Sequence, residues 1–161
     1  MSFTLEPATA PDSTVAHMLA LTALADAPHT EAMLAALDNA LMRPSEEYRA
    51  IVARDRRAVV GVIVFGEVAG AHGAGKIYLV AVDAAARRRG IASGLVDAAC
   101  EVLSERSARF VMVELPAHPR LTDGRRLMER GGFREEGRME DYVRDGVPLL
   151  FLRRSLASRI V

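Results

Sequence analysis

The stretch from Ile77 to Ser107 constrains the fold most, because it joins a strand to a helix through a turn of three arginines. Residues 77–82 read IYLVAV, an apolar and β-branched run that is typical of a buried strand. Residues 91–107 place apolar side chains at helical spacing and acidic side chains on the opposite face. We therefore predict a strand–helix–strand unit in the middle of the chain. The predicted buried face of its helix consists of Ile91, Leu95, Ala99, Val102 and Leu103.

The turn between strand and helix, Arg87–Gly90, indicates an anion site. Three adjacent like charges repel one another, which an anion bound beside them would offset. A helix N-terminus offers unpaired backbone N–H groups and the positive end of the helix dipole, a combination that suits phosphate. Gly90 and Ala92 allow a ligand to approach the backbone closely, and Ser93 adds a hydroxyl donor. We predict a pyrophosphate site over residues 87–93; the alternative is a solvated turn.

Other phosphate-binding motifs do not fit this chain. The pattern G-x-x-x-x-G-K-[ST] of nucleotide-binding P-loops does not occur. The stretch GAHGAG, residues 70–75, precedes a strand rather than a helix, so we predict a turn there.

The remaining pattern predicts a single α+β domain spanning residues 1–161, with the order β-α-α-β-β-β-α-β-α-β-β. Val15, Met18, Leu19 and Thr22 recur at helical spacing, which predicts the face of a first helix. A second helix runs from about Pro28 to Pro44, and a short helix ends at the pair Gly131–Gly132. The predicted strands cover residues 3–6, 49–54, 58–68, 77–82, 109–115, 133–143 and 149–153.

Composition and charge argue against several classes of protein. Acidic and basic residues number 21 each, so no global charge attracts nucleic acid or an anionic membrane. The single cysteine, Cys100, allows no intramolecular disulfide and is interpreted as a core residue. The four histidines are far apart without ligand spacing, so we predict no metal site. The N-terminus lacks a signal pattern and no apolar run approaches the ~18 residues that span a bilayer, so we expect a cytoplasmic protein.

Two motifs in order give the chain a family resemblance. Arg87-Arg88-Arg89-Gly90-Ile91-Ala92 is similar to the pattern [Q/R]-x-x-G-x-[G/A], and it follows the run-in IYLVAVDAAA. The second motif is a helix that ends in Gly132-Phe133, within GRRLMERGGF. Together with the element order, these motifs resemble the GCN5-related N-acetyltransferase (GNAT) superfamily. The resemblance implies a mixed, mostly antiparallel sheet flanked by helices.

The resemblance also implies acetyl-CoA as co-substrate. Its pyrophosphate would bind the amides of residues 88–92, with the side chains of Arg87 and Arg89 nearby. Its pantetheine arm would pair like an extra strand with Val80, Ala81 and Val82, where two strands splay apart, because buried pantetheine amides need partners. The implied cofactor-binding residues are Val80, Ala81, Val82, Arg87, Arg88, Arg89, Gly90, Ile91, Ala92 and Ser93.

Glu114 is the candidate general base. Acetyl transfer requires a neutral amine, and a lysine-like amine with a pKa near 10.4 is mostly charged at neutral pH, so a base helps. Glu114 ends the predicted strand 109–115, where a carboxylate is unusual because buried charges are costly. Related amino-terminal acetyltransferases place a glutamate on this strand. The alternative is a solvated carboxylate, or one paired with an arginine.

The general acid is less clear from the sequence. Many members of the family carry a tyrosine on the helix before the Gly-Phe pair, and Met128 occupies that position here. The leaving thiolate would depart unassisted or through water, or Tyr142 would protonate it. His118, in a loop between prolines, is interpreted as a surface histidine, and Asp83 and Glu67 are reserve carboxylates.

The resemblance implies an N-acetyltransferase that acts on a primary amine of a small molecule or protein, by direct attack in a ternary complex. Residues 15–41 and 141–148 would form the acceptor groove, and the family often forms homodimers. The alternative, which rests on Met128, is a non-catalytic or weakly catalytic acyl-CoA-binding regulatory module. A third hypothesis is a protein that binds a different phosphate ligand.

Overall fold

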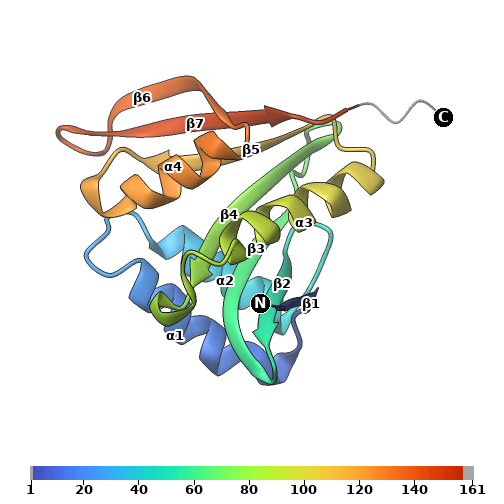
Figure 1. Ribbon diagram of the computed structural model, residues 1–161. Helices are drawn as coiled ribbons and strands as arrows, with labels where there is room; N and C mark the ends of the chain where they lie inside the picture. Colours follow the sequence, from blue (N-terminus) through green and yellow to red (C-terminus); the bar gives the residue numbers. More distant parts are fainter. Residues whose placement is uncertain (1, 158–161) are drawn as a thin grey trace.

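The computed structural model describes residues 2–157 (Figure 1). Within them, the chain forms a seven-stranded sheet in the order β1-β2-β3-β4-β5-β7-β6, in which β4 and β5 pair in parallel and the other neighbours are antiparallel. The strands are β1 (Thr4–Pro7), β2 (Arg49–Asp55), β3 (Ala58–Glu67), β4 (Ala74–Val82), β5 (Phe110–Pro116), β6 (Arg134–Arg144) and β7 (Val147–Ser155). The α-helices are α1 (Ser13–Ala23), α2 (Glu31–Met42), α3 (Ile91–Glu105) and α4 (Thr122–Arg130). This order and the mostly antiparallel sheet confirm the predicted α+β fold class.

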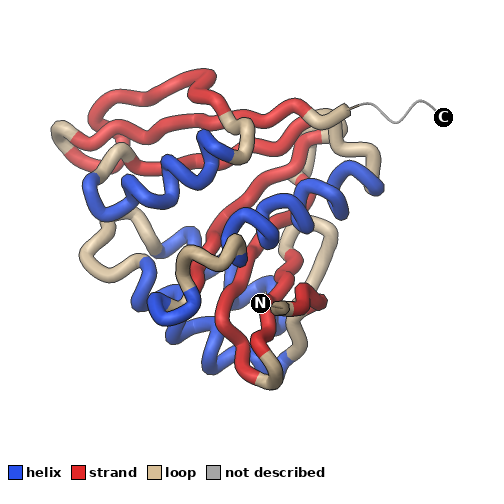
Figure 2. Tube along the Cα trace, in the orientation of Figure 1, coloured by secondary structure: helices blue, strands red, loops and turns tan. Residues whose placement is uncertain are grey.

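Helix α3 packs closely on the sheet because glycines leave room for it. A Cβ atom at Gly61 of β3 would lie 3.1 Å from both Ile91 and Leu95, and one at Gly75 of β4 would lie 2.7 Å from Leu103. Helix α3 crosses in front of β3 and β4 in Figure 2, and α2 lies behind these strands. The sheet is therefore covered on both faces where β3 and β4 lie.

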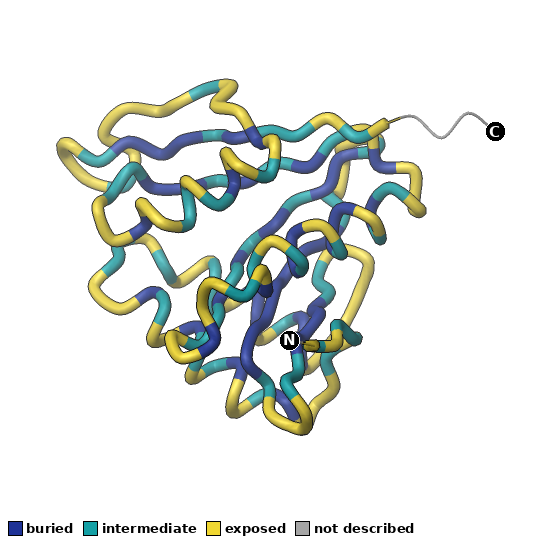
Figure 3. The backbone as a smooth tube through the Cα atoms, viewed as in Figure 1, coloured by how far each residue is buried: buried dark blue, intermediate teal, exposed yellow. Residues whose placement is uncertain are grey.

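Burial follows the strands, with one exception. The buried segments in Figure 3 run along the middle of the sheet, whereas the edge strand β6 is mostly exposed. Its sequence, REEGRMEDYVR, is charged almost throughout. Charged side chains on an edge strand discourage pairing with another chain.

Strand β4 carries a bulge at Tyr78. The consecutive residues Val64 and Phe65 of β3 pair with Leu79 and Ile77, so Tyr78 has no partner across this ladder. Pairing between β4 and β5 ends at the same place, with Ile77 opposite Val113. Since a bulge bends its strand and increases the local twist, it accounts for the separation of the two strands beyond this point. Figure 1 shows β4 and β5 close together at one end and apart at the other.

The face of α1 that packs on the sheet differs from the predicted one. Val15, Met18 and Thr22 are exposed, whereas Ala16 and Ala20 are fully buried. Alanine side chains allow a helix to lie close to its neighbours, and this close approach decides which face turns inward. Val15, Met18 and Leu21 are left on the outside of α1, whereas Leu19 of the predicted face is partly buried against the core.

A buried carboxylate anchors the segment that leads into α1. Asp12 is 5% exposed; its Oδ1 accepts a hydrogen bond of 2.7 Å from Arg54 Nη2, and its Oδ2 accepts one of 2.8 Å from the Thr9 N–H. Burial alone would raise the pKa of Asp12, but the hydrogen bonds from Thr9 and Arg54 outweigh it and lower the pKa. Arg54 also pairs with Glu6. These contacts fix the start of α1 to β2.

Helix α4 ends as predicted at Gly131 and Gly132. Gly132 has a φ of +88°, which lies in the left-handed region that glycine adopts without strain. No helix in residues 2–157 is both long enough and apolar enough to cross a membrane.

Candidate active site

The N-terminus of α3 lies directly after the predicted arginine turn. Gly90 occupies the position before the helix with a φ of +78°, and Arg88 also has a positive φ, of +62°. The first backbone hydrogen bond of the helix joins the Gly94 N–H to the Gly90 carbonyl at 2.9 Å. In residues 2–157, no backbone carbonyl accepts a hydrogen bond from the N–H groups of residues 91–93, so these three donors are available to an anion.

The three arginines have different surroundings. Arg87 and Arg88 are exposed and form no ion pair with any other residue that the structure describes. The side chain of Arg89 is mostly buried and its Nη1 lies 2.8 Å from Asp55 Oδ2 on β2. The Arg89 side chain, predicted to lie near the pyrophosphate, is thus already paired with a carboxylate. Its guanidinium fixes the turn to the sheet, and its backbone remains part of the turn.

The residues predicted to pair with pantetheine lie on the separated part of β4. Val80, Ala81 and Val82 follow the last paired residue, Ile77, so the β4 edge that faces β5 has no strand partner there. The opposite edge of this segment pairs with β3, in the register Ile63–Val80, Val62–Ala81 and Gly61–Val82. The free edge can accept an extended ligand as an additional strand.

Glu114 lies at the point where β4 and β5 separate. It follows Val113, the last β5 residue paired with β4, and its Oε1 lies 3.2 Å from Lys76 Nζ on β4. Both side chains line a small cavity of about 30 Å³. The other residues that line it are His29, Ala32, Met33, Ile77, Tyr78 and Leu149. The alternative to a base at Glu114 was a carboxylate that is solvated or paired with an arginine. The partner of Glu114 in the structure is a lysine, Lys76.

Tyr78, the residue at the bulge, forms one wall of this cavity. Its ring lies 5.2 Å from that of Tyr48 and 5.0 Å from Lys76 Nζ, measured to the ring centroid. Burial, helped by the nearby Tyr48 and Glu47, raises the pKa of Tyr78 to about 12. Its hydroxyl therefore stays protonated at neutral pH and can donate a hydrogen bond.

His29 connects the cavity to Tyr142. Its ring meets the Tyr142 ring edge-on, with a centroid distance of 5.8 Å. His29 has a φ of +61°, a conformation that is uncommon outside glycine and concentrates at functional sites. The structure thus brings both predicted catalytic residues to one region, Glu114 in the cavity wall and Tyr142 behind His29.

No role was predicted for Lys76 or Tyr78, and His29 was included only as part of residues 15–41, the predicted acceptor groove. Lys76 stands out in the sequence, because it is the chain's single lysine. Lys76 and Tyr78 also interrupt an otherwise apolar strand. No sequence pattern marks His29 as a cavity residue, since its place depends on how the connection between α1 and α2 folds over the sheet.

The other candidates lie elsewhere. The Nδ1 of His118 accepts a hydrogen bond from the Arg120 N–H, and the Oδ1 of Asp83 accepts one from the Ala85 N–H. Neither residue lines the cavity that contains Glu114. Met128, at the position of the usual tyrosine, is buried in the core.

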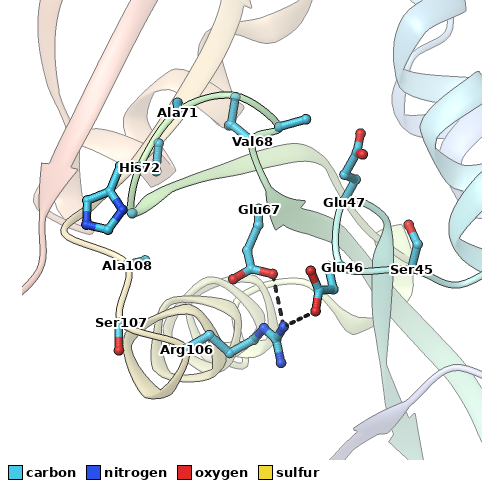
Figure 4. A pocket seen from close by; sticks show the side chains of 13 residues that line it. Ser45, Glu46, Glu47, Glu67, Val68, Ala71, His72, Arg106, Ser107 and Ala108 are labelled. Carbon is cyan, nitrogen blue, oxygen red and sulfur yellow. Dashed lines mark hydrogen bonds and ion pairs between the residues drawn. The ribbon is translucent and has the colours of Figure 1, made fainter.

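A larger pocket of about 630 Å³ lies near the opposite end of α3 (Figure 4). There Arg106 Nη2 lies 2.8 Å from Glu46 and 3.1 Å from Glu67. Glu67, the second reserve carboxylate, is therefore paired with an arginine away from the cavity that contains Glu114. This pocket borders Ala74, at the end of β4 that is paired with β5. It is therefore separate from the free edge of β4 and from the N-terminus of α3.

The comparisons with known proteins agree with this geometry. The acetyltransferase (GNAT) family model matches residues 15–133. No curated protein is significantly similar to the chain in sequence. The crystal structure of a protein assigned to the GNAT family, from Desulfovibrio desulfuricans, is similar with a TM-score of 0.86 and 19% identity, over 97% of this chain and 100% of that one.

Two further structures share the fold. Ard1 from Thermoplasma volcanium has a TM-score of 0.78 and 22% identity, over 98% of this chain and 100% of that one. The Salmonella typhimurium protein yncA, whose structure contains acetyl-CoA, has a TM-score of 0.75 and 16% identity, over 100% of this chain and 98% of that one.

The match of the acetyltransferase family model over residues 15–133 identifies the chain as an acyltransferase. The chain belongs to the GNAT family of acetyltransferases. Acetyl-CoA is the co-substrate of this family, so the predicted family, fold class and co-substrate are confirmed.

Proposed function

We propose that this protein is an N-acetyltransferase that transfers the acetyl group of acetyl-CoA to a primary amine, by direct attack within a ternary complex. The observation that carries the proposal is the position of Glu114. This carboxylate lines a cavity at the point where β4 separates from β5, next to the free edge of β4. The amine acceptor would therefore meet a base where the acetyl donor has a strand edge to bind.

Binding of acetyl-CoA rests on two groups of donors. The N–H groups at the start of α3 and the exposed side chains of Arg87 and Arg88 would hold the pyrophosphate. The free edge of Val80–Val82 would pair with the amides of the pantetheine arm. Arg89 supports this site indirectly, because its pair with Asp55 fixes the turn.

The acceptor ammonium loses two protons in the reaction, and the sulfur of coenzyme A gains one. Glu114 takes a proton from the acceptor ammonium, and the neutral nitrogen then attacks the thioester carbonyl carbon. The C–N bond forms, the C–S bond breaks, the sulfur of coenzyme A leaves as a thiolate, and the nitrogen releases its second proton to water. Tyr142 is the candidate acid that protonates it, since it lies against His29 at the rim of the cavity.

The alternative function, an acyl-CoA-binding module without catalysis, is favoured by Met128. This side chain is buried and cannot donate a proton. The alternative predicts that acetyl-CoA binds and that no amine releases coenzyme A. The two functions differ in turnover and agree in binding, so both must be measured.

Calorimetric titration with acetyl-CoA, with coenzyme A and ATP as comparisons, tests the binding site. We expect micromolar binding of acetyl-CoA, weakened about tenfold or more by Arg87→Ala because a charge-assisted phosphate contact is lost. Arg43→Ala is the matched control, since Arg43 is also exposed but follows α2. Equal weakening by both variants would contradict the assigned site.

Release of coenzyme A in the presence of primary amines tests the reaction. Glu114→Gln keeps the shape of the side chain but removes its basicity, so we expect kcat to fall about a hundredfold or more while acetyl-CoA affinity is retained. Turnover by Glu114→Gln equal to that of the wild type would exclude Glu114 as the base. Binding without turnover by the wild type, across a broad panel of amines, would establish the alternative function.

A further inference from the structure

Lys76 is the feature of the cavity that the proposed reaction does not use. It is the chain's single lysine, and its ammonium lies 3.2 Å from the carboxylate of Glu114. Both side chains are partly buried, with 21% and 33% of their surface exposed. Acetyl transfer needs a base in this position, but it does not need a fixed positive charge beside that base.

A fixed ammonium affects which acceptors can bind. An acceptor whose only charge is an ammonium would approach Glu114 and meet the charge of Lys76 at similar distance, and this repulsion offsets the attraction. A simple alkylamine or a polyamine therefore gains little from the pair. A molecule that carries a negative charge next to its amine would find an opposite charge for each of its own groups.

We propose that the acceptor is a small zwitterion, an amino acid whose free carboxylate binds Lys76 while its amine faces Glu114. This inference rests on the proposed function and names the substrate class of the same site. An α-amino acid holds its two charged groups on adjacent carbon atoms, a spacing that matches the close pair of Lys76 and Glu114. The ion pair then opens and each partner keeps an opposite charge nearby, which limits the cost of desolvation.

The remaining walls of the cavity suit the rest of such a molecule. Ala32, Met33 and Leu149 provide apolar surface beside the ion pair. The Tyr78 ring, whose centroid lies 5.0 Å from Lys76 Nζ, borders the position that the carboxylate would take. The cavity volume, about 30 Å³, is that of one water molecule, so the acceptor would reach Lys76 and Glu114 from the exposed side of the ion pair.

The test compares each α-amino acid with its own amide and methyl ester, in a coenzyme A release assay. The amide and the ester lack the carboxylate, and their amines are less basic, so proton removal alone favours them. We expect the free acids to react with kcat/KM at least tenfold higher, mainly through a lower KM. Lys76→Met should abolish this preference, and Lys76→Arg, which keeps the positive charge, should retain most of it.

Each outcome has a distinct meaning. Amides, esters or polyamines that react as well as the free acids would overturn the proposal while leaving the N-acetyltransferase function intact. An unchanged preference in Lys76→Met would also overturn it, provided that this variant binds acetyl-CoA like the wild type. Absence of turnover with every amine, despite binding of acetyl-CoA, would instead refute the proposed function itself and the inference with it.

Discussion

Replacement of Gly66 by alanine is expected to destabilise the protein, although alanine is the better residue in an ordinary strand. Gly66 is a buried residue of β3, and an added Cβ would lie 1.9 Å from the carbonyl oxygen of Glu47. The same Cβ would lie 2.8 Å from the carbonyl oxygen of Glu46. Both obstacles are backbone atoms, which cannot move away by rotation of a side chain.

The magnitude follows from the distance that the turn must move. Ordinary contacts of a Cβ begin near 3.4 Å, so the backbone at Glu47 must shift by about 1.5 Å. Overpacking of this kind costs about 1–3 kcal/mol. The hydrogen bond of 2.8 Å from the Glu67 N–H to the Glu46 carbonyl would be strained or lost, which costs about 1 kcal/mol more. The entropic gain from replacing glycine is only about 0.5–1 kcal/mol, so we expect a net loss of about 1–3.5 kcal/mol.

Urea unfolding, followed by circular dichroism, measures this loss. In thermal unfolding it corresponds to a fall in Tm of about 2–14 °C for a chain of this size. Gly124→Ala is the matched control, because Gly124 lies in α4 and an added Cβ there meets nothing within 4 Å. We expect this control to be neutral or stabilising by up to about 1 kcal/mol.

A Gly66→Ala variant that is as stable as the wild type, with an unchanged m-value, would contradict the predicted loss of stability. Such a result would mean that the turn at residues 45–48 moves at no cost. Tyr48 is the last residue of that turn and packs against Tyr78, so the variant should also bind the amine acceptor more weakly. An acceptor KM that does not change would show that the turn and the cavity are independent.

Three further predictions concern single side chains. Tyr142→Phe should lower kcat about a hundredfold at saturating acetyl-CoA if Tyr142 is the acid; an unchanged kcat would assign proton transfer to water. Cys100 is buried, and burial raises its pKa to about 11, so a thiol reagent should label it only in denaturant. Labelling of the native protein as fast as an exposed free thiol is labelled would contradict this prediction. The pKa of His17 is raised, chiefly by its hydrogen bond to the Ser13 carbonyl and also by Asp38, against the effect of burial. Its stabilisation should therefore be full below pH ~6.5 and disappear as the pH rises through the raised pKa; the difference in stability between wild type and His17→Gln, up to about 1 kcal/mol, should shrink from pH 5.5 to pH 8.

Several features of the fold were predictable because they are local. The glycine before α3 and the glycine pair after α4 mark the helix ends through their backbone freedom alone. The alternation and length of the apolar runs separate strands from helices without reference to any partner. For the same reason, the arginine turn could be placed at the entrance of a helix.

The orientation of α1 was not predictable in this way. Its larger residues, Val15 and Met18, suggest one buried face, and the structure buries Ala16 and Ala20 instead. How closely a helix approaches a sheet depends on the sheet, which a helical periodicity does not describe. The ion pair of Arg89 was not predictable either, since only the position of Asp55 on β2 shows that the charge of Arg89 is paired.

By itself, the sequence determined the order of the elements, the place of the arginine turn before a helix and the family, because each depends on residues close together in the chain. The tertiary structure alone decided the composition of the cavity. His29, Lys76 and Glu114 come from three distant segments, and they meet because the bulge at Tyr78 turns β4 away from β5. A bulge depends on the register between two strands, and register is a property of the assembled sheet.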